Sequence, residues 1–185
     1  AWQNRRRRYN SSMPANIEIK ARTQNFDGLR LRLEAMSGGT GERLLQEDTF
    51  FHSPDGRLKL RVLQSGPAQL IHYERPDTEG PKRSSYHVFE TGDPGNLKTV
   101  LGGALGIRGV VRKERVLFLV GQTRVHLDRV ENLGDFVELE VVLRPGQTDA
   151  EGREVARTLM LRLGIRETDL LAGAYVDMPP AKDRG

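Results

Sequence analysis

Charged side chains of the same sign recur two positions apart, in the pairs Lys59 and Arg61, Lys113 and Arg115, and Glu138 and Glu140. Residues i and i+2 of a β-strand point to the same face of the sheet, so each pair would present its charges together. Lysine and arginine bind phosphate oxygens, whereas carboxylates bind divalent cations. A site that brought such pairs together could therefore hold a polyphosphate and its metal ion.

The segments that carry these pairs have the pattern of strands. Seven segments combine period-two alternation with strand-forming residues, namely 17–22, 57–62, 69–75, 84–89, 110–120, 123–130 and 136–143. Asp55-Gly56 is typical of a turn just before the second of them. We therefore predict that strands position the charged pairs.

Three further segments, 25–36, 94–105 and 149–163, have apolar residues at helical spacing. Asp93 is a candidate N-cap with Pro94 in the first helical position. Thr148 and Glu151 have the spacing of a capping box, and Gly164 is a candidate helix stop. A short turn is expected around residues 167–172.

This mixture of elements predicts an α+β domain built on a large antiparallel sheet or a closed barrel, with peripheral helices. Alternation alone leaves open where the polar faces point. If they point outward, the charged pairs are ordinary solvated surface. If they point inward, the pairs line a water-filled tunnel with a basic half and an acidic half.

Composition excludes several kinds of site. The chain has 185 residues, which fits one domain, and it contains no cysteine, so disulfides and thiolate sites are impossible. Its histidines are scattered, at 52, 72, 87 and 126, which argues against a histidine-rich metal site. No apolar run approaches the length of a membrane span, and we expect a cytoplasmic protein with no membrane partner.

The positive net charge comes from the N-terminus. Lys and Arg number 29 against 25 Asp and Glu, and four of the arginines are Arg5 to Arg8. We interpret residues 1–12 as a disordered leader or expression remnant, residues 13–180 as one domain and 181–185 as a tail. A basic anchor for nucleic acid or anionic lipid is the alternative for residues 1–12.

Six motifs, in order along the chain, resemble those of the CYTH family, the triphosphate tunnel metalloenzymes. They are Asn16-Ile-Glu-Ile-Lys20, Gln46-Glu-Asp-Thr-Phe-Phe51, Gly56-Arg-Leu-Lys-Leu-Arg61, the segment from Leu70 to Asp77, Val111-Arg-Lys-Glu-Arg115, and the segment from Arg124 to Glu140. The resemblance spans residues 16–177 and implies an eight-stranded antiparallel β-barrel with its charged faces inward. The family includes class IV adenylate cyclases, thiamine triphosphatases and inorganic triphosphatases.

The resemblance also implies roles for individual residues. Those expected to hold Mg²⁺ or Mn²⁺ are Glu18, Glu138 and Glu140, with Asp128 as a further acidic lining residue. Those expected to hold the triphosphate are Lys59, Arg61, Arg75, Lys113 and Arg115, together with Arg124, which shares a strand face with Asp128. Lys20 matches the signature lysine that helps to activate or orient the attacking water.

One position departs from the family pattern. Asn16 stands where the signature has its first glutamate, and an amide brings no charge to a metal ion. This substitution predicts weaker binding, or binding of a single metal ion. His126 is expected to be a structural hydrogen-bonding residue, and Tyr73 and Tyr175 are expected to pack in the core.

The leading expectation is a metal-dependent phosphohydrolase acting on a small-molecule triphosphate. The alternatives are a class IV-type adenylate cyclase and, from a different class, a module that binds phosphate compounds without turnover. No specific nucleic-acid partner is expected. A homodimer is expected, because an exposed sheet face of such a barrel is commonly covered by another chain.

Overall fold

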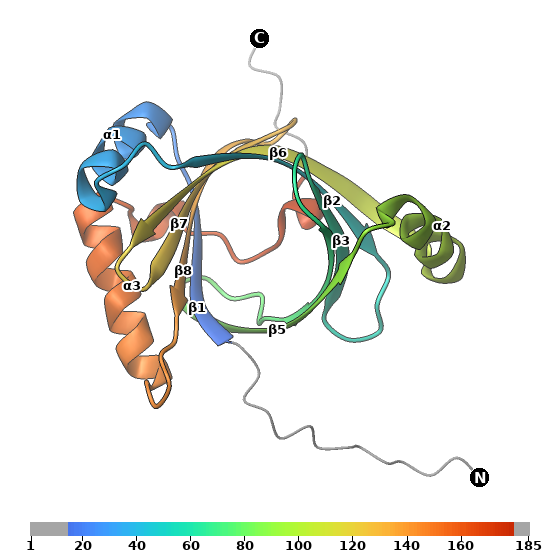
Figure 1. Ribbon diagram of the computed structural model, residues 1–185. Coiled ribbons are helices and arrows are strands. Elements are labelled where there is room, and N and C mark those ends of the chain that lie inside the picture. Colours follow the sequence, from blue (N-terminus) through green and yellow to red (C-terminus); the bar gives the residue numbers. More distant parts are fainter. Residues whose placement is uncertain (1–14, 180–185) are drawn as a thin grey trace.

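Eight strands close into one barrel in the computed structural model, which describes residues 15–179 (Figure 1). The strands are β1 (Ala15–Arg22), β2 (Glu42–Phe51), β3 (Arg57–Leu63), β4 (Ala68–Glu74), β5 (Lys82–Thr91), β6 (Ile107–Val120), β7 (Thr123–Val130) and β8 (Gly134–Val142). Around the barrel their order is β1-β5-β4-β3-β2-β6-β7-β8, and every neighbouring pair is antiparallel. The predicted eight-stranded antiparallel barrel is confirmed. The expected leader and tail lie outside the described residues.

Within residues 15–179, three α-helices surround the barrel: α1 (Phe26–Ser37), α2 (Pro94–Leu105) and α3 (Asp149–Leu163). The starts of α2 and α3 follow the predicted caps, because the side chains of Asp93 and Thr148 accept hydrogen bonds from the backbone N–H groups of Asn96 and Glu151. Two short 3₁₀ turns follow, over Glu167–Asp169 and Tyr175–Asp177.

Strand β2 was not among the segments predicted from alternation. Its outer face carries Arg43, Leu45 and Glu47. Its inner face carries Leu44, Gln46 and Asp48. Both faces therefore mix apolar and charged residues. A strand with two mixed faces gives no period-two contrast, so the periodicity that marks the other strands is missing here.

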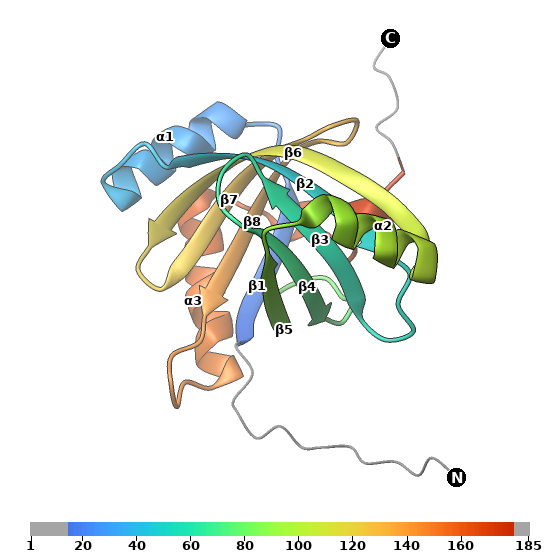
Figure 2. The same ribbon diagram turned by 45° about the vertical axis from the view of Figure 1, so that its right-hand side comes forward.

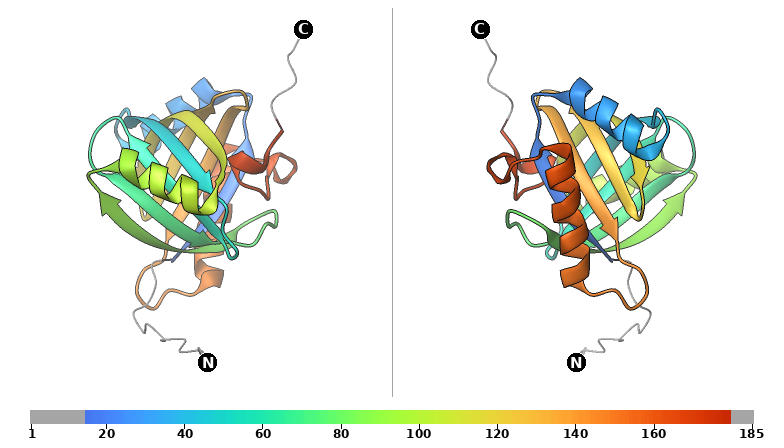
Figure 3. Two further views of the ribbon diagram at one scale, coloured as in Figure 1. Left: turned by 90° about the vertical axis from the view of Figure 1, so that its right-hand side faces the viewer. Right: turned by 90° about the vertical axis from the view of Figure 1, so that its left-hand side faces the viewer.

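Helices α1 and α3 pack against the outside of β1, β6, β7 and β8 (Figures 2 and 3). The outward residues of these strands, such as Ile19, Leu127 and Leu139, are at most 1% exposed and share one core with Leu33 and Leu163 of the helices. Each such side chain contributes about 1.5–3 kcal/mol by leaving water. Because the apolar faces point outward to the helices, the charged faces point into the barrel, as the tunnel alternative requires.

Helix α2 covers the barrel far less completely. It lies against β2 and β3 (Figure 3, left), where Leu97 and Leu101 reach the apolar cluster around Phe51 and Leu60. No residue of α2 is buried, and Val100 is 57% exposed. The predicted apolar face of this helix is therefore only partly used.

The C-terminal segment closes one end of the barrel, where it crosses the opening in Figure 1. Leu170 forms a β-bridge with Ala21, and the Leu171 N–H donates to the Lys20 carbonyl over 2.9 Å. Beyond them Tyr175 is buried, with its hydroxyl on Asp128. Among the described residues, none of the helices has the length and apolar character needed to cross a membrane.

Candidate active site

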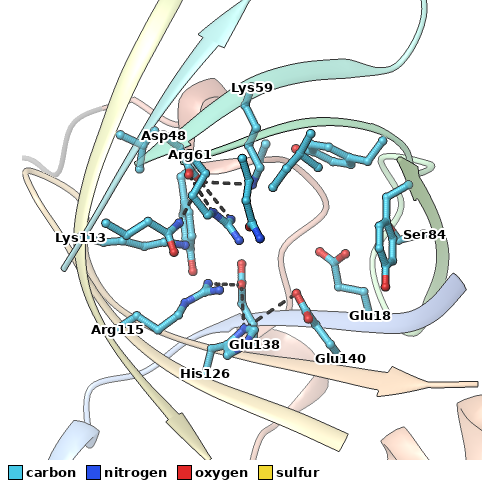
Figure 4. A pocket seen from close by; sticks show the side chains of 18 of the residues that line it. Glu18, Asp48, Lys59, Arg61, Ser84, Lys113, Arg115, His126, Glu138 and Glu140 are labelled. Carbon is cyan, nitrogen blue, oxygen red and sulfur yellow. Dashed lines mark hydrogen bonds and ion pairs between the residues drawn. The ribbon is translucent and has the colours of Figure 1, made fainter. Parts of the chain in front are cut away.

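The inward faces of all eight strands enclose one cavity of about 330 Å³ (Figure 4). Its charged lining comprises seven basic side chains and four carboxylates: Lys20, Lys59, Arg61, Arg75, Lys113, Arg115 and Arg124, with Glu18, Asp48, Glu138 and Glu140. Every predicted site residue except Asp128 lines this cavity. The excess of positive charge favours a multiply charged anion.

One basic pair is held by Asp48. Its carboxylate accepts hydrogen bonds from Lys59 over 3.1 Å and from Arg61 over 2.9 Å, and it is only 2% exposed. Burial raises the pKa of Asp48, but Arg61 and Lys59 outweigh burial and hold this pKa well below its usual value. Burial and the neighbouring Arg61 lower the pKa of Lys59 to about 8. A fixed carboxylate thus orients two cations toward the cavity.

Asp128 holds the other basic pair in the same way. The carboxylate is fully buried and accepts hydrogen bonds from Lys113 over 2.9 Å, from Arg115 over 2.6 Å and from the Tyr175 hydroxyl over 3.0 Å. From its sequence position, Asp128 is expected to line the tunnel beside the metal ligands. The structure instead places it behind Lys113 and Arg115, with both oxygens engaged.

An acidic group lies across the barrel from Lys59 and Arg61 (Figure 4). It consists of His126, Glu138 and Glu140, whose donor atoms lie within 4.8 Å of one another. The His126 Nδ1 atom lies 3.6 Å from Glu138 Oε2 and 3.8 Å from Glu140 Oε1. Two carboxylates and an imidazole are donors that suit divalent cations.

The imidazole of His126 is available to a ligand. Its Nδ1 atom is buried and has no hydrogen-bond partner within residues 15–179. Burial and Arg115 lower the pKa of His126, which favours the neutral ring that can bind a metal ion. An orphaned nitrogen between two carboxylates fits a divalent cation, a role beyond the structural one that the sequence predicts for His126.

Lys20 lies between the acidic group and the closed end. Its ammonium is 3.1 Å from Glu138 Oε1, 3.8 Å from the ring centroid of Tyr175, and it also contacts the Gly173 carbonyl. The remaining predicted residues flank this group. Glu18 pairs with Arg75 and lies opposite Glu140 in the β1–β8 register, and Arg124 donates to Glu140 over 3.0 Å.

Asn16 lies on the same strand face as Glu18 and lines the cavity. It is 4% exposed, and its Oδ1 atom lacks a hydrogen-bond partner among the described residues. The amide therefore occupies the place expected for the missing glutamate without supplying charge. In this chain His126, and not a third carboxylate, is the potential metal ligand beside Glu138 and Glu140.

The motifs gave no role to Asp48, which the structure places beneath Lys59 and Arg61. Tyr175 packs in the core against Phe136, as expected, but its hydroxyl also donates to Asp128. The alternation of Gln46, Asp48 and Phe50 would have placed Asp48 on an inward face, had β2 been recognised. Tyr175 reaches Asp128 only because the chain returns to the barrel 47 residues later. No local pattern signals such a contact.

A closed barrel with its charges inside is the architecture that the motifs implied. Residues 14–175 match the CYTH domain family, and the chain belongs to this family. The Aeromonas hydrophila protein named Adenylate cyclase CyaB is 25% identical over 169 residues, which cover 86% of this chain and 85% of that protein.

Solved structures from two archaea share the fold. The PH1012 protein of Pyrococcus horikoshii OT3 is 26% identical, with a TM-score of 0.79 over 88% of this chain and 98% of that one. A conserved protein of Pyrococcus furiosus is 23% identical, with a TM-score of 0.76 and the same coverage. The fold is thus shared over nearly the whole length of both archaeal chains.

Proposed function

We propose that the chain is a metal-dependent enzyme that binds triphosphate compounds in the cavity and hydrolyses a phosphoanhydride bond. One observation carries this proposal. Two basic pairs, each fixed by a buried aspartate, share a cavity with the His126, Glu138 and Glu140 group. Such an arrangement matches a polyanion on one side and its cation on the other.

The basic side chains supply most of the binding. Lys59, Arg61, Lys113 and Arg115 hold the phosphate oxygens, with Arg75 and Arg124 at the flanks. Asp48 and Asp128 keep these cations oriented before the ligand arrives, so little reorganisation is needed as charge develops. We assign Mg²⁺ or Mn²⁺ to Glu138, Glu140 and His126, with Glu18 nearby; the bound ion would polarise a phosphoryl group and neutralise its charge.

Lys20 is the proposed catalytic residue. Its ammonium contacts Glu138 on the side of the cavity that carries the metal group, so it can donate a hydrogen bond to the attacking water and orient it. Glu138 in turn fixes the position of the ammonium. In hydrolysis the water oxygen forms a bond to phosphorus while the bond from that phosphorus to the bridging oxygen breaks, and a proton of the water passes to solvent. The products are a diphosphate and orthophosphate, or a monophosphate and pyrophosphate.

A class IV-type adenylate cyclase is the second candidate, favoured by the likeness to the Aeromonas hydrophila cyclase. In that reaction the ribose 3′-hydroxyl of ATP attacks the α-phosphorus, loses its proton and displaces pyrophosphate. The same metal and basic groups serve both reactions. The two differ in which phosphorus faces the nucleophile.

Product analysis tests the proposal. The protein is incubated with tripolyphosphate, ATP or thiamine triphosphate in Mg²⁺ or Mn²⁺, and the products are followed by ³¹P NMR. Hydrolysis releases orthophosphate or pyrophosphate without cyclic AMP, whereas cyclisation yields cyclic AMP and pyrophosphate together. Unchanged substrates under all conditions would contradict both reactions and leave a binding module. Lys20→Met should retain ligand binding and lose turnover.

The affinity for tripolyphosphate should fall as the pH rises through about 8, because Lys59 loses its charge there. The affinity falls and does not rise because only the protonated ammonium of Lys59 attracts the negatively charged phosphates. In Lys59→Arg the side chain stays charged, so this part of the decline should disappear. Calorimetric titrations from pH 6.5 to 9.5 measure both proteins, and identical pH profiles would contradict the role of Lys59.

A further inference from the structure

The ammonium of Lys20 has more contacts than its ion pair with Glu138 on β8. The side chain is buried, and its nitrogen lies 3.8 Å from the ring centroid of Tyr175 and 3.4 Å from the Gly173 carbonyl oxygen. Both of these residues belong to the C-terminal segment that closes the barrel, here called the closing segment (residues 170–178). The catalytic side chain of the proposed function is therefore held by a strand and by the closing segment together.

The ring of Tyr175 is itself firmly held. Its hydroxyl donates to Asp128 over 3.0 Å, and the ring packs on Phe136 in an edge-to-face arrangement with the centroids 4.8 Å apart. Two residues later, Asp177 accepts a hydrogen bond from Arg57 over 3.0 Å. Burial and the charge of Asp128 raise the pKa of Tyr175 well above its usual value, so the hydroxyl stays neutral. The ring therefore serves as a fixed surface, and not as an acid or a base.

The same ring contacts a second cation. The Lys113 ammonium lies 4.8 Å from the ring centroid of Tyr175. An aromatic face attracts an ammonium group most strongly where water is excluded, and both Lys20 and Lys113 are buried. In the proposed function Lys113 holds the phosphates and Lys20 orients the attacking water. One ring thus fixes the position of the water-orienting ammonium relative to a phosphate-binding one.

The contacts of Lys20 differ in strength. An ammonium group carries three N–H donors on a flexible stem, so it needs more than one partner to stay in place. The contacts with Glu138, at 3.1 Å, and with the Tyr175 ring are close. The 3.4 Å to the Gly173 oxygen is longer than usual for an N–H···O hydrogen bond. The donor that faces Gly173 is therefore the one that can turn to a water molecule, while Glu138 and Tyr175 keep the nitrogen in place.

We propose that Tyr175 is a positioning residue, whose ring holds the Lys20 ammonium at the point from which it orients the attacking water. This inference rests on the proposed function and adds a residue of the closing segment to the site. Tyr175 does not touch the reacting atoms. Glu138 is also assigned to the metal ion, so its attraction for Lys20 weakens when the ion is bound. The contact with the neutral ring does not depend on the ion and keeps Lys20 in place.

Steady-state kinetics separate the ring from its hydroxyl, with whichever of tripolyphosphate, ATP and thiamine triphosphate turns over. In Tyr175→Leu the aromatic face is lost, so kcat should fall about tenfold or more, because a misplacement of about 1 Å can cost about a hundredfold. KM should stay within about twofold of the wild-type value, since Lys113 keeps its hydrogen bond to Asp128. Tyr175→Phe keeps the ring and should restore kcat to nearly the wild-type value.

A spectroscopic measurement without substrate or metal tests the contact itself. The chain has six lysines, so NMR of selectively ¹³C-labelled lysine gives few ε-methylene signals, and Lys20→Met identifies the signal of Lys20. The ring current of an aromatic face shifts protons above it upfield. The Lys20 signal should be shifted upfield in the wild type and in Tyr175→Phe, and it should return to the ordinary lysine position in Tyr175→Leu.

Phe118→Leu is the matched control for loss of a buried aromatic ring. Phe118 is 1% exposed and belongs to the core between the barrel and the helices, so its loss should change neither kcat nor the Lys20 signal. Thermal melting confirms that each protein is folded.

Three results would overturn the inference and leave the proposed function standing. They are an unshifted Lys20 signal in the wild type, an unchanged kcat in Tyr175→Leu, and a fall in kcat that is equal in Tyr175→Leu and either Tyr175→Phe or Phe118→Leu. If the wild type turns over none of the three compounds, or if Lys20→Met keeps full turnover, the proposed function itself fails and the inference fails with it.

Discussion

Glu138→Gln/Glu140→Gln is expected to lose Mn²⁺ binding, with affinity falling by more than about a hundredfold. Both carboxylates belong to the group around the orphaned His126 Nδ1 atom, and removal even of a residue that only supports a metal ligand costs 10- to 100-fold. Electron paramagnetic resonance of free Mn²⁺ measures the loss. In the wild type, nitrogen hyperfine coupling to the bound Mn²⁺ should reveal the imidazole, and His126→Gln should abolish that coupling.

The matched control is Glu47→Gln/Glu114→Gln. It removes the same two charges from the outer face of β2 and β6, where Glu47 and Glu114 pair with exposed arginines. Mn²⁺ binding should be unchanged. Because Glu138 also pairs with Lys20 and Arg115, Glu140→Gln alone serves as a variant with less effect on folding. Undiminished Mn²⁺ affinity in both cavity variants would contradict the metal site.

Tripolyphosphate should raise the melting temperature of the wild-type protein by about 5–10 °C at a hundredfold excess over its dissociation constant. The reason is that the ligand relieves repulsion among cations that line one cavity and binds only the folded state. In Arg61→Gln/Lys113→Gln one cation is lost from each basic pair. Since a hydrogen bond to a charged group contributes about 1.5–3 kcal/mol, most of this stabilisation should disappear.

Arg43→Gln/Arg112→Gln controls for overall charge. These arginines lie on the outer faces of β2 and β6, where their side chains are 64% and 59% exposed. The rise in melting temperature should be retained, because exposed ion pairs contribute little and the cavity is untouched. If the inner and outer variants lose stabilisation equally, the cavity is not where tripolyphosphate binds.

The period-two placement of like charges was enough to predict strands and to group the site residues by face. It could not decide whether the charged faces point inward, because alternation is the same for a solvated strand and for a tunnel. The answer depends on what covers the other face. Here Ile19, Leu127 and Leu139 pack against α1 and α3, which only the tertiary structure shows.

Contacts between distant segments account for the rest of what sequence reasoning missed. Asp128 is a carboxylate on the inward face of β7, as a metal ligand would be. However, its oxygens accept hydrogen bonds from Lys113, Arg115 and Tyr175. His126 gains its place beside Glu138 from the β7–β8 register, in which the two residues are partners. Register between strands follows from packing and turns, and residue types alone do not specify it.

Diffraction from crystals grown with Mn²⁺ and methylene-bridged tripolyphosphate tests the central claim most directly. Anomalous scattering at the manganese edge locates the ion independently of the phosphates. We predict a peak within bonding distance of Glu138 and Glu140, with the phosphate oxygens against Lys59, Arg61, Lys113 and Arg115. Manganese and phosphate bound only on the outer surface, with the cavity free of both, would contradict the account.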